Sequence, residues 1–383
     1  SYAVQAGGAV DAETGAITPP IHITTTYERE ADLGYPKQFI YGRPDNATVR
    51  HAESVITALE QGEQSLLFGS GMSAAVSLFL SLPRPAHVIA PKVMYWSLRD
   101  WLGNEATKYG IEATFVDSTD SDQVARAIRP GETKLVWLET PANPLWQIAD
   151  IRAVAAIANW AGAALAVDST CATPVLSQPL KLGADIVMHS ATKYLNGHSD
   201  VLAGSLTFGE AASELLDDVV RLRGQHGNVL GPFEAAMLLR GMRTLHVRVA
   251  HQCRSAETIA RQLAAHAKVE DVLYPGLEGA PGHALAAKQM SGGFGGMLSL
   301  RVKGGEIAAV ATAARLKVWK RATSLGGVES LVEHRASIEG PASPCPPDLL
   351  RLSVGLEAVD DLIADLDQAL SGNSLSALQS ASQ

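Results

Sequence analysis

Short apolar runs alternate with segments of helical periodicity from about residue 51 onward, where apolar side chains recur every three to four positions. The runs that predict strands are Leu66–Gly69, His87–Ala90, Glu112–Val116, Lys134–Glu139, Ala163–Asp168, Asp185–His189 and Ala203–Phe208. The segments that predict helices are His51–Gln61, Ser70–Leu82, Ser97–Tyr109, Asp120–Ile128 and Ile151–Trp160. Continuous apolar strands separated by helices are typical of sheets buried on both faces, so we expect an α/β fold with a mostly parallel central sheet.

The pattern becomes sparser after the polar, glycine-rich stretch Gly224–Pro232. Beyond it the sequence predicts a long helix near His246–His266, strands at Met297–Val302, Lys317–Arg321 and Leu350–Val354, and helices at Gly305–Arg315 and Ala358–Leu370. We therefore predict an extended arm over residues 1–50, which is rich in Gly, Pro and Thr, and a large domain over 51–235. A smaller α+β domain is predicted over 236–383, with a loose tail from about 371.

Composition narrows the classes of protein to consider. Hydrophobic residues make up 46% and charged residues 19%, which suits a globular protein with a large core. The net charge of -9, without any block of Lys and Arg, disfavours a nucleic-acid partner. Cys171, Cys253 and Cys345 form no metal-binding or disulfide pattern. No apolar stretch is long enough to span a membrane and no secretion signal is recognisable, so we expect a cytoplasmic protein without a membrane partner.

The segment Asp185–Asp200 carries the strongest chemical signal in the chain. Its apolar run ends abruptly in the polar side chains of Ser190, Thr192 and Lys193. A buried strand that ends in this way delivers polar groups to the edge of a sheet, where ligands of open α/β sheets bind. A lysine there, beside hydroxyls that can bind a phosphate, is suited to carry a Schiff base once its surroundings lower its pKa. This segment predicts an enzyme with covalently attached pyridoxal phosphate.

Three other strand ends are polar in a way that fits the same cofactor. Phe68–Ser73 places small residues between a strand and a helix, where backbone N–H groups favour a phosphate. Asp168 ends a strand and could keep a pyridine nitrogen protonated, and Glu139 and Asn143 flank a proline-shaped turn. Each feature alone has a structural alternative, such as a helix cap or a solvated loop. Together with Lys193 they form the set that such a site needs.

These motifs resemble those of the Cys/Met-metabolism family of pyridoxal-phosphate enzymes. The similarity runs from about Thr18 to Leu370 and is carried by Asp185–Gly204, Ser324–Leu331 and Leu350–Glu357. The family includes cystathionine γ-synthase, cystathionine γ- and β-lyases, methionine γ-lyase and O-acyl-homoserine sulfhydrylases. The resemblance implies the type I pyridoxal-phosphate-dependent transferase fold, which is the fold of aspartate aminotransferase.

The resemblance also implies roles in binding pyridoxal 5'-phosphate. Lys193 would hold the cofactor and shuttle protons, and Tyr95 would stack on its ring and assist proton transfer. Asp168 would pair with the pyridine nitrogen, and Asn143 would lie on the ring hydroxyl side. The implied phosphate ligands are Gly71, Met72, Ser190 and Thr192, with Tyr41 and Arg43 reaching the phosphate of a neighbouring subunit. A homo-oligomer is therefore expected, a dimer with shared active sites that assembles further into a tetramer.

The resemblance implies an amino-acid substrate whose α-carboxylate is bound by Arg351, with help from Asn143, Ser324 and Thr323. Arg351 lies in an apolar run, where an unpaired charge is costly to bury, and the alternative role is a structural ion pair. Ser324 would orient Lys193 or the substrate. Thr323 stands where synthases and γ-lyases often have glutamate, which puts preference for cystathionine in doubt. Trp96 follows Tyr95 where glycine is usual, and either narrows the pocket or packs in the core.

The implied reaction is γ-replacement or γ-elimination on sulfur amino acids or O-activated homoserine, most like that of cystathionine γ-synthase in trans-sulfuration and methionine or cysteine metabolism. The alternatives are a carbon–sulfur lyase acting on cystathionine or methionine, and an O-acyl-homoserine sulfhydrylase. An aminotransferase or a non-catalytic binding protein on the same fold is a more distant alternative. Intact Lys193, Asp168 and Tyr95 argue against the binding protein.

Overall fold

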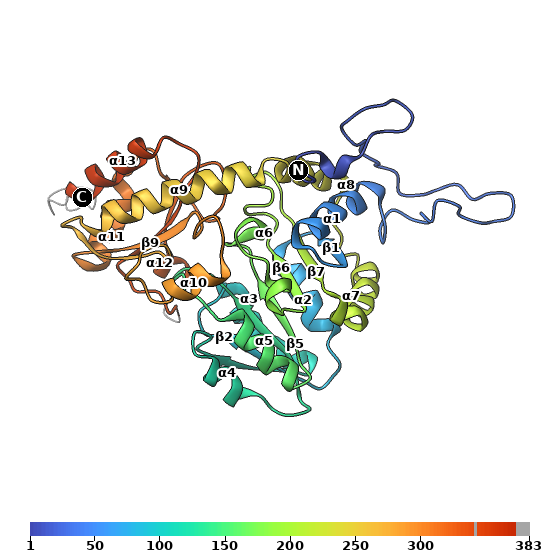
Figure 1. Ribbon diagram of the computed structural model, residues 1–383, viewed down its shortest axis with the longest axis horizontal. Coiled ribbons are helices and arrows are strands. Elements are labelled where there is room, and N and C mark those ends of the chain that lie inside the picture. Colours follow the sequence, from blue (N-terminus) through green and yellow to red (C-terminus); the bar gives the residue numbers. More distant parts are fainter. Residues whose placement is uncertain (341–342, 373–383) are drawn as a thin grey trace, which may run out of the picture.

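A seven-stranded sheet forms the centre of the larger part of the molecule in the computed structural model, which describes residues 1–340 and 343–372 (Figure 1). Its strand order is β1-β7-β6-β5-β4-β2-β3. The strands are β1 (Gln64–Phe68), β2 (Ala86–Pro91), β3 (Ile111–Val116), β4 (Thr133–Glu139), β5 (Ala164–Asp168), β6 (Ile186–His189) and β7 (Gly204–Phe208). Only β7 of these seven pairs antiparallel with its neighbours β1 and β6. The prediction of a mostly parallel central sheet is confirmed.

Helices cover both faces of this sheet. They are α1 (Ala47–Glu60), α2 (Gly71–Ser81), α3 (Trp96–Asn104), α4 (Ser121–Ala127), α5 (Ile151–Trp160), α6 (Thr173–Leu176), α7 (Ser213–His226) and α8 (Pro232–Met242). Alternate residues of one strand point to opposite faces. In β1, Leu66 and Phe68 therefore join the cluster that includes α2, whereas Leu67 joins the cluster that includes α1 and α8. Burial on both faces explains why these strands are continuous apolar runs in the sequence.

A five-stranded sheet with order β10-β11-β12-β9-β8 forms the C-terminal part. Its strands are β8 (Val269–Leu273), β9 (Met297–Val302), β10 (Lys320–Arg321), β11 (Leu331–His334) and β12 (Leu349–Ser353). The helices of this part are α9 (Leu245–Ala264), α10 (His283–Gln289), α11 (Gly305–Arg315), α12 (Arg335–Glu339) and α13 (Val359–Ser371). Strands β8 and β11 were not predicted, because charged side chains interrupt their short apolar runs. The strand predicted over Lys317–Arg321 is shorter in the structure and begins at Lys320.

Two local predictions about helices need correction. The helix predicted over Ser97–Tyr109 ends at Asn104, and a separate 3₁₀ turn, Ala106–Tyr109, follows it. The glycine-rich stretch at 224–232 is largely helical at its two ends, because α7 continues to His226 and α8 begins at Pro232. Gly227 ends α7 in the left-handed region at φ 68°, a conformation in which glycine is favoured. Other 3₁₀ turns occur at Ala6–Gly8, Pro179–Leu182 and Glu210–Ala212.

Ala3 and Ala6 are buried in the core cluster that includes α1 and α8, whereas much of the segment between the Ala6–Gly8 turn and α1 extends away from the body as an arm of long loops (Figure 1). Several large apolar side chains on this arm are exposed, including Ile17, Ile23 and Leu33. The division into an arm, a large domain and a small domain stays a prediction. The tail predicted to be loose lies outside the described residues beyond 372. Among the described helices, none combines the length and apolar character needed to cross a membrane.

Candidate active site

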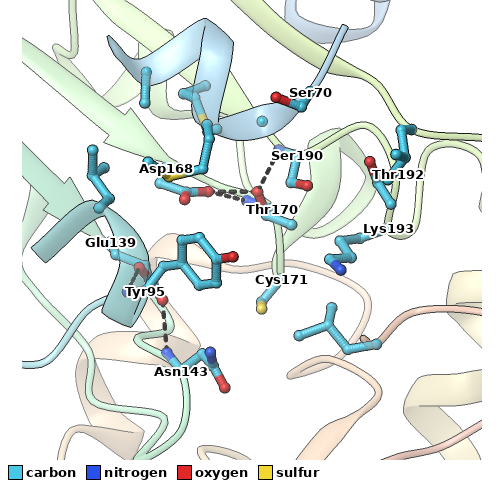
Figure 2. Close-up of a pocket in the computed structure, with 17 residues that line it drawn as sticks. Ser70, Tyr95, Glu139, Asn143, Asp168, Thr170, Cys171, Ser190, Thr192 and Lys193 are labelled. Carbon is cyan, nitrogen blue, oxygen red and sulfur yellow. Dashed lines mark hydrogen bonds between the residues drawn. The ribbon is translucent and has the colours of Figure 1, made fainter. Parts of the chain in front are cut away.

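A pocket lies where the carboxyl ends of β4, β5 and β6 meet the start of α2 (Figure 2). Ligands of open α/β sheets bind at such an edge, so its position follows from the topology. The predicted site residues that line it are Gly71, Met72, Tyr95, Asn143, Asp168, Ser190, Thr192 and Lys193. Glu139, Thr170, Cys171 and the apolar side chains of Leu98, Leu202 and Leu325 also line it. Eight of the sequence-predicted residues are thus brought together around one cavity.

Lys193 projects into this pocket from the turn that follows β6. The turn is fixed by the backbone, because the N–H of Lys193 donates to the carbonyl of Ser190 at 3.0 Å. Its Nζ donates to Oγ of Ser324 at 2.8 Å. Burial, and then the positive charge of Arg351, lower the pKa of Lys193 to about 8. A lysine with a lowered pKa has a larger neutral fraction, and the neutral amine is the form that acts as a nucleophile.

The start of α2 presents backbone N–H groups to the same pocket. Ser70 caps the helix: its Oγ accepts from the N–H of Ser73 at 3.1 Å, and Oγ of Ser73 accepts from the N–H of Ser70 at 3.0 Å. A Cβ on Gly71 would lie 2.8 Å from Cβ of Ser190, so only glycine allows the helix to approach this loop so closely. The positive end of the helix dipole and the Ser190 hydroxyl therefore form a cradle that fits a phosphate. Thr192 lines the same pocket, but its Oγ1 donates to the carbonyl of Ala203 at 3.1 Å.

Asp168 lies at the end of β5 on the opposite side of the pocket from Lys193 (Figure 2). Thr170 donates to its Oδ1 from the backbone N–H at 3.0 Å and from Oγ1 at 2.5 Å. The N–H of Ser190 in turn donates to Oγ1 of Thr170 at 2.8 Å. Burial raises the pKa of the Asp168 carboxyl. A cationic ring nitrogen beside it would favour the ionised form again, so this environment fits a pyridinium partner.

Glu139 at the end of β4 holds two other pocket residues in place. Its Oε2 accepts from the backbone N–H of Tyr95 at 2.7 Å, and its Oε1 accepts from the backbone N–H of Asn143 at 2.8 Å. Burial, and then the neighbouring Asp168, raise the pKa of Glu139 to about 8. The Tyr95 ring extends into the pocket between Asp168 and Asn143 (Figure 2). Neither Glu139 nor Thr170 was assigned a cofactor role from the sequence, although each adjoins a predicted strand end.

Arg351 lies on β12 behind Lys193 and is 4% exposed. Its Nη2 is 2.5 Å from Oε2 of Glu333 and donates to the carbonyl of Ser324 at 2.7 Å. Its Nη1 donates to Oδ1 of Asn143 at 3.2 Å. Ser324 has φ 84°, a strained value for serine, and contacts both Lys193 and Arg351. The ion pair considered as an alternative role for Arg351 is present, and the same guanidinium contacts two residues predicted to bind substrate.

Six residues discussed from the sequence do not line the pocket, and two of them, Ser324 and Arg351, reach it only through their contacts with Lys193 and Asn143. Tyr41 is 47% exposed on the arm, and the guanidinium of Arg43 donates to the carbonyl of Gly224. The role predicted for these two needs a neighbouring subunit, and it stays a prediction. Thr323 is exposed, and Trp96 packs its ring 6.4 Å from that of Tyr95 without lining the pocket.

An α/β fold that gathers a lysine, a carboxylate and a helix start at one sheet edge defines the type I class of pyridoxal-phosphate enzymes. Residues 1–371 match the family described as Cys/Met metabolism PLP-dependent enzyme, and the chain belongs to that family.

Named relatives narrow the comparison. Cystathionine gamma-synthase of Mycobacterium tuberculosis is 42% identical over 374 residues, which cover 96% of this chain and 95% of that protein. L-methionine gamma-lyase of Fusobacterium nucleatum is 41% identical, with 93% and 94% covered. The crystal structure of metB from Corynebacterium glutamicum superposes with a TM-score of 0.93 at 40% identity, covering 97% of each chain. A cystathionine gamma synthase from Xanthomonas oryzae pv. oryzae, in complex with aminoacrylate and cysteine, gives 0.91 at 37% identity, covering 96% of each.

Proposed function

We propose that this protein catalyses γ-replacement, with γ-elimination as a related activity, on O-activated homoserine or a sulfur amino acid, most like a cystathionine γ-synthase. The observation that carries the proposal is the position of Lys193. Its amine lies in a pocket between a helix start that fits a phosphate and the buried guanidinium of Arg351. That arrangement suits a cofactor with a phosphate and a substrate with a carboxylate.

We further propose that pyridoxal 5'-phosphate is held by Lys193, by the α2 cradle with Ser190 and Thr192, and by Asp168 at the ring nitrogen. When bound, this cofactor supplies an electron sink that stabilises negative charge at Cα of the amino acid. The amine of Lys193 would accept the Cα proton and later return a proton to the substrate. A base near neutrality suits both transfers, in line with the pKa of about 8 for this amine. The Tyr95 ring and the Asn143 amide orient the reacting groups.

Arg351 would hold the α-carboxylate of the substrate through a charge-assisted pair. A substrate anchored there places Cα close to Lys193, because Ser324 contacts both residues. The side chain of the substrate then extends toward Leu202 and Leu325, which suits an unbranched chain with a leaving group at Cγ. Departure of the group at Cγ would require that a second proton leave Cβ, and the amine of Lys193 is the group in the pocket that would accept it. A thiol then adds to Cγ in replacement, or water releases a 2-oxo acid and ammonia in elimination.

A carbon–sulfur lyase that acts on methionine or another amino acid without a distal amino group is the second candidate, and a specific observation favours it. Thr323 is exposed and uncharged, so it offers no carboxylate to a distal amino group of a cystathionine product. Relatives named L-methionine gamma-lyase are nearly as similar to this chain as the synthases. A synthase and a lyase can share the residues that bind the cofactor, and they differ in whether a thiol or water captures the intermediate.

The proposed function has consequences for the oligomeric state and the location of the protein. We infer a homo-oligomer in which Tyr41 and Arg43 serve the pocket of a neighbouring subunit, at least a dimer and a tetramer when complete. The exposed apolar side chains of the arm support this assembly. A cytoplasmic location is supported by Cys171, Cys253 and Cys345, which are buried free thiols.

The test supplies O-succinyl-, O-acetyl- or O-phosphohomoserine together with cysteine, and in parallel cystathionine or methionine alone. We expect a thioether product from at least one activated homoserine with cysteine. Release of a 2-oxo acid from the single amino acids, with no replacement product from any pair, would reject the synthase in favour of the lyase. Borohydride reduction followed by peptide mapping tests the cofactor separately. A reduced adduct is expected on the peptide that contains Lys193, and its absence would overturn the assignment.

A further inference from the structure

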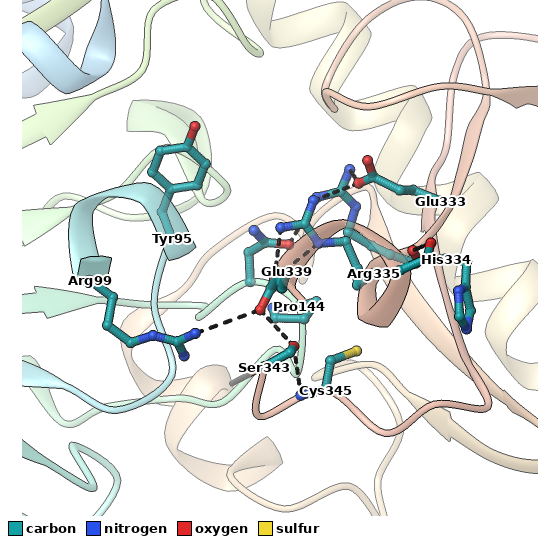
Figure 3. A network of polar contacts seen from close by, with 12 residues as sticks. Tyr95, Arg99, Pro144, Glu333, His334, Arg335, Glu339, Ser343 and Cys345 are labelled. Carbon is teal, nitrogen blue, oxygen red and sulfur yellow. Dashed lines mark hydrogen bonds and ion pairs between the residues drawn. The ribbon is translucent and has the colours of Figure 1, made fainter. Parts of the chain in front are cut away.

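Arg351 begins a chain of buried ion pairs that continues through Glu333 and Arg335 to Glu339, and Figure 3 shows the last three of these residues. Arg351 and Glu333 are direct cross-strand neighbours on β12 and β11. Arg335, at the start of α12, donates from Nη1 to Oε2 of Glu333 at 2.7 Å. It also donates from Nη2 to Oε1 of Glu339 at 2.7 Å. The side chains of these four residues are each between 2% and 5% exposed.

The two arginines compete for one oxygen atom. Oε2 of Glu333 lies 2.5 Å from Nη2 of Arg351 and 2.7 Å from Nη1 of Arg335. The other oxygen, Oε1, is buried and has no hydrogen-bond partner within residues 1–340 and 343–372. A carboxylate that used both oxygens would satisfy each arginine independently. Here the bond to one arginine strengthens as the bond to the other weakens, because both draw on the same lone pairs.

The four buried members of the network balance in charge, because Arg351 and Arg335 face Glu333 and Glu339. Arg335 pairs with both carboxylates, whereas Arg351 pairs with Glu333 alone among the described carboxylates, so the buried charge of Arg351 is the less fully compensated. Arg351 is also the member that contacts Asn143, which lines the pocket, and Ser324, which accepts from Lys193. A further anion therefore fits best beside Arg351.

Arg335 is held in place from its far side. Its Nε and Nη2 both donate to Oε1 of Glu339, at 3.2 and 2.7 Å, and Ser343 donates to Oε2 of the same carboxylate at 2.7 Å. Figure 3 shows Arg99 approaching Glu339 from the helix that begins beside Tyr95. The guanidinium of Arg335 is thus fixed toward Glu333 whether or not Arg351 keeps its own contact. A fixed partner is what allows a buried carboxylate to lose one of two cations at low cost.

We propose that Arg335 is a positioning residue that shares Glu333 with Arg351 and so frees Arg351 to bind the substrate carboxylate. Without substrate, Glu333 neutralises Arg351. When a carboxylate arrives, Arg351 exchanges part of its contact with Glu333 for the substrate, and Arg335 keeps Glu333 paired. Glu333 thereby lowers the affinity of Arg351 for carboxylates, and Arg335 restores it. This inference rests on the substrate role proposed for Arg351, but it does not depend on which reaction follows.

The experiment measures carboxylate binding without catalysis. Methylthiobutanoate, a thioether carboxylate that lacks an α-amino group, cannot react with the cofactor, and calorimetric titration of the holoenzyme gives its Kd. We expect Glu333→Gln to tighten binding about three- to ten-fold, because the competing charge is removed and the shape is kept. We expect Arg335→Met to weaken it by about ten-fold, because Glu333 is then left with Arg351 alone. The double variant should bind within about three-fold of Glu333→Gln, which shows that Arg335 acts through Glu333.

Control variants separate this effect from loss of structure. Glu257→Gln removes one partner of the exposed Glu257–Arg261 pair and should leave Kd unchanged. Arg335→Lys keeps the charge but cannot bridge Glu333 and Glu339 as the guanidinium does, so it should weaken binding less than Arg335→Met does. Thermal unfolding checks each variant, and if Arg335→Met does not fold, the direction of the Glu333→Gln effect decides alone.

Weaker binding by Glu333→Gln would overturn the proposal. Strict additivity of the two single-variant changes in binding free energy in the double variant would overturn it as well. Arg351→Met provides the check on the underlying function. If Arg351→Met binds methylthiobutanoate with the same Kd as the parent protein, both the substrate role of Arg351 and the sharing of Glu333 fail. If it loses the probe while Glu333→Gln gives no tightening, only the sharing fails.

Discussion

The two walls of the pocket are built by different means. The sheet-edge wall consists of Gly71, Asp168, Ser190 and Lys193, which stand at the ends of parallel strands or the start of a helix. What we call the C-terminal wall lies behind the lining residues and reaches them through the bond from Arg351 to Asn143. It consists of Arg351 with Glu333, Arg335 and Glu339, which are joined by buried ion pairs across two strands and a short helix. The first wall is set by topology, because parallel strands end at one edge. The second is set by pairing of charges in a dry interior.

This difference predicts that the two walls affect different kinetic constants. Groups on the sheet-edge wall take part in proton transfer or in covalent attachment of the cofactor, so their loss should lower kcat. Groups on the C-terminal wall hold a charge on the substrate, so their loss should raise KM with a smaller effect on kcat. Glu139 belongs to the sheet edge but fixes the backbones of Tyr95 and Asn143, and Asn143 contacts Arg351. Variants of each kind can break or sharpen this comparison.

The largest effect is expected for Lys193→Ala. Removing a nucleophile that also transfers protons should lower kcat by at least about 10³-fold, since no nearby group replaces both roles. Steady-state rates and the loss of the borohydride-reducible adduct provide the measurement. Lys181→Ala, at an exposed lysine outside the pocket, is the matched control and should keep full activity. A Lys193→Ala protein with more than a tenth of the parent kcat would remove Lys193 from the chemistry.

Arg351→Lys tests the second wall. A lysine keeps the positive charge but cannot make the planar pair that a guanidinium makes with a carboxylate. We expect KM for the amino-acid substrate to rise by about 10²-fold, while kcat falls much less. Kinetics over a wide range of substrate concentration separate the two constants. An unchanged KM with a large loss of kcat would contradict the division between the walls.

Glu139→Gln should have a smaller effect on turnover and a distinct effect on stability. An amide cannot accept two backbone hydrogen bonds as a carboxyl group does, so we expect kcat/KM to fall by about ten-fold.

The pKa of Glu139 is raised from 4.5 to about 8 in the folded protein, so the native state keeps a proton that the unfolded chain releases between these values. The contribution of Glu139 to stability is therefore largest at low pH and is lost as the pH rises toward 8. Urea unfolding at pH 5 and pH 8 should show that the free energy of unfolding of Glu139→Gln, relative to that of the parent, is higher at pH 8 than at pH 5. An equal difference at both values would mean that Glu139 is ionised throughout.

The residues that could be predicted are those whose role depends on local chain geometry. Lys193, Asp168 and Gly71 each follow or begin an element that the apolar pattern reveals, so their meeting at one edge follows from a parallel sheet. Resemblance to a family added Tyr95, Ser324 and Arg351, which no local pattern places in the pocket. The contact of Lys193 with Ser324 joins residues 131 positions apart.

Glu333, Arg335 and Glu339 could not be predicted as a network. In the sequence they are three charges within seven residues, a pattern that normally indicates a solvated surface segment. Strand β11 was missed for the same reason, because Glu333 interrupts its apolar run. The signal that could have found them is an arginine inside the neighbouring apolar strand, since a buried guanidinium requires a buried carboxylate.

The sequence by itself determined the central parallel sheet, the edge at which its polar residues gather and the family to which the chain is similar. These follow from hydrophobic periodicity and from short motifs, in which the interacting residues lie close together in the chain. The tertiary structure alone decided that Arg351 is paired with Glu333, that Arg335 shares that carboxylate, and that Glu139 holds Tyr95 and Asn143. Those contacts depend on strand register and on the exclusion of water from the interior, and neither can be predicted from short stretches of sequence.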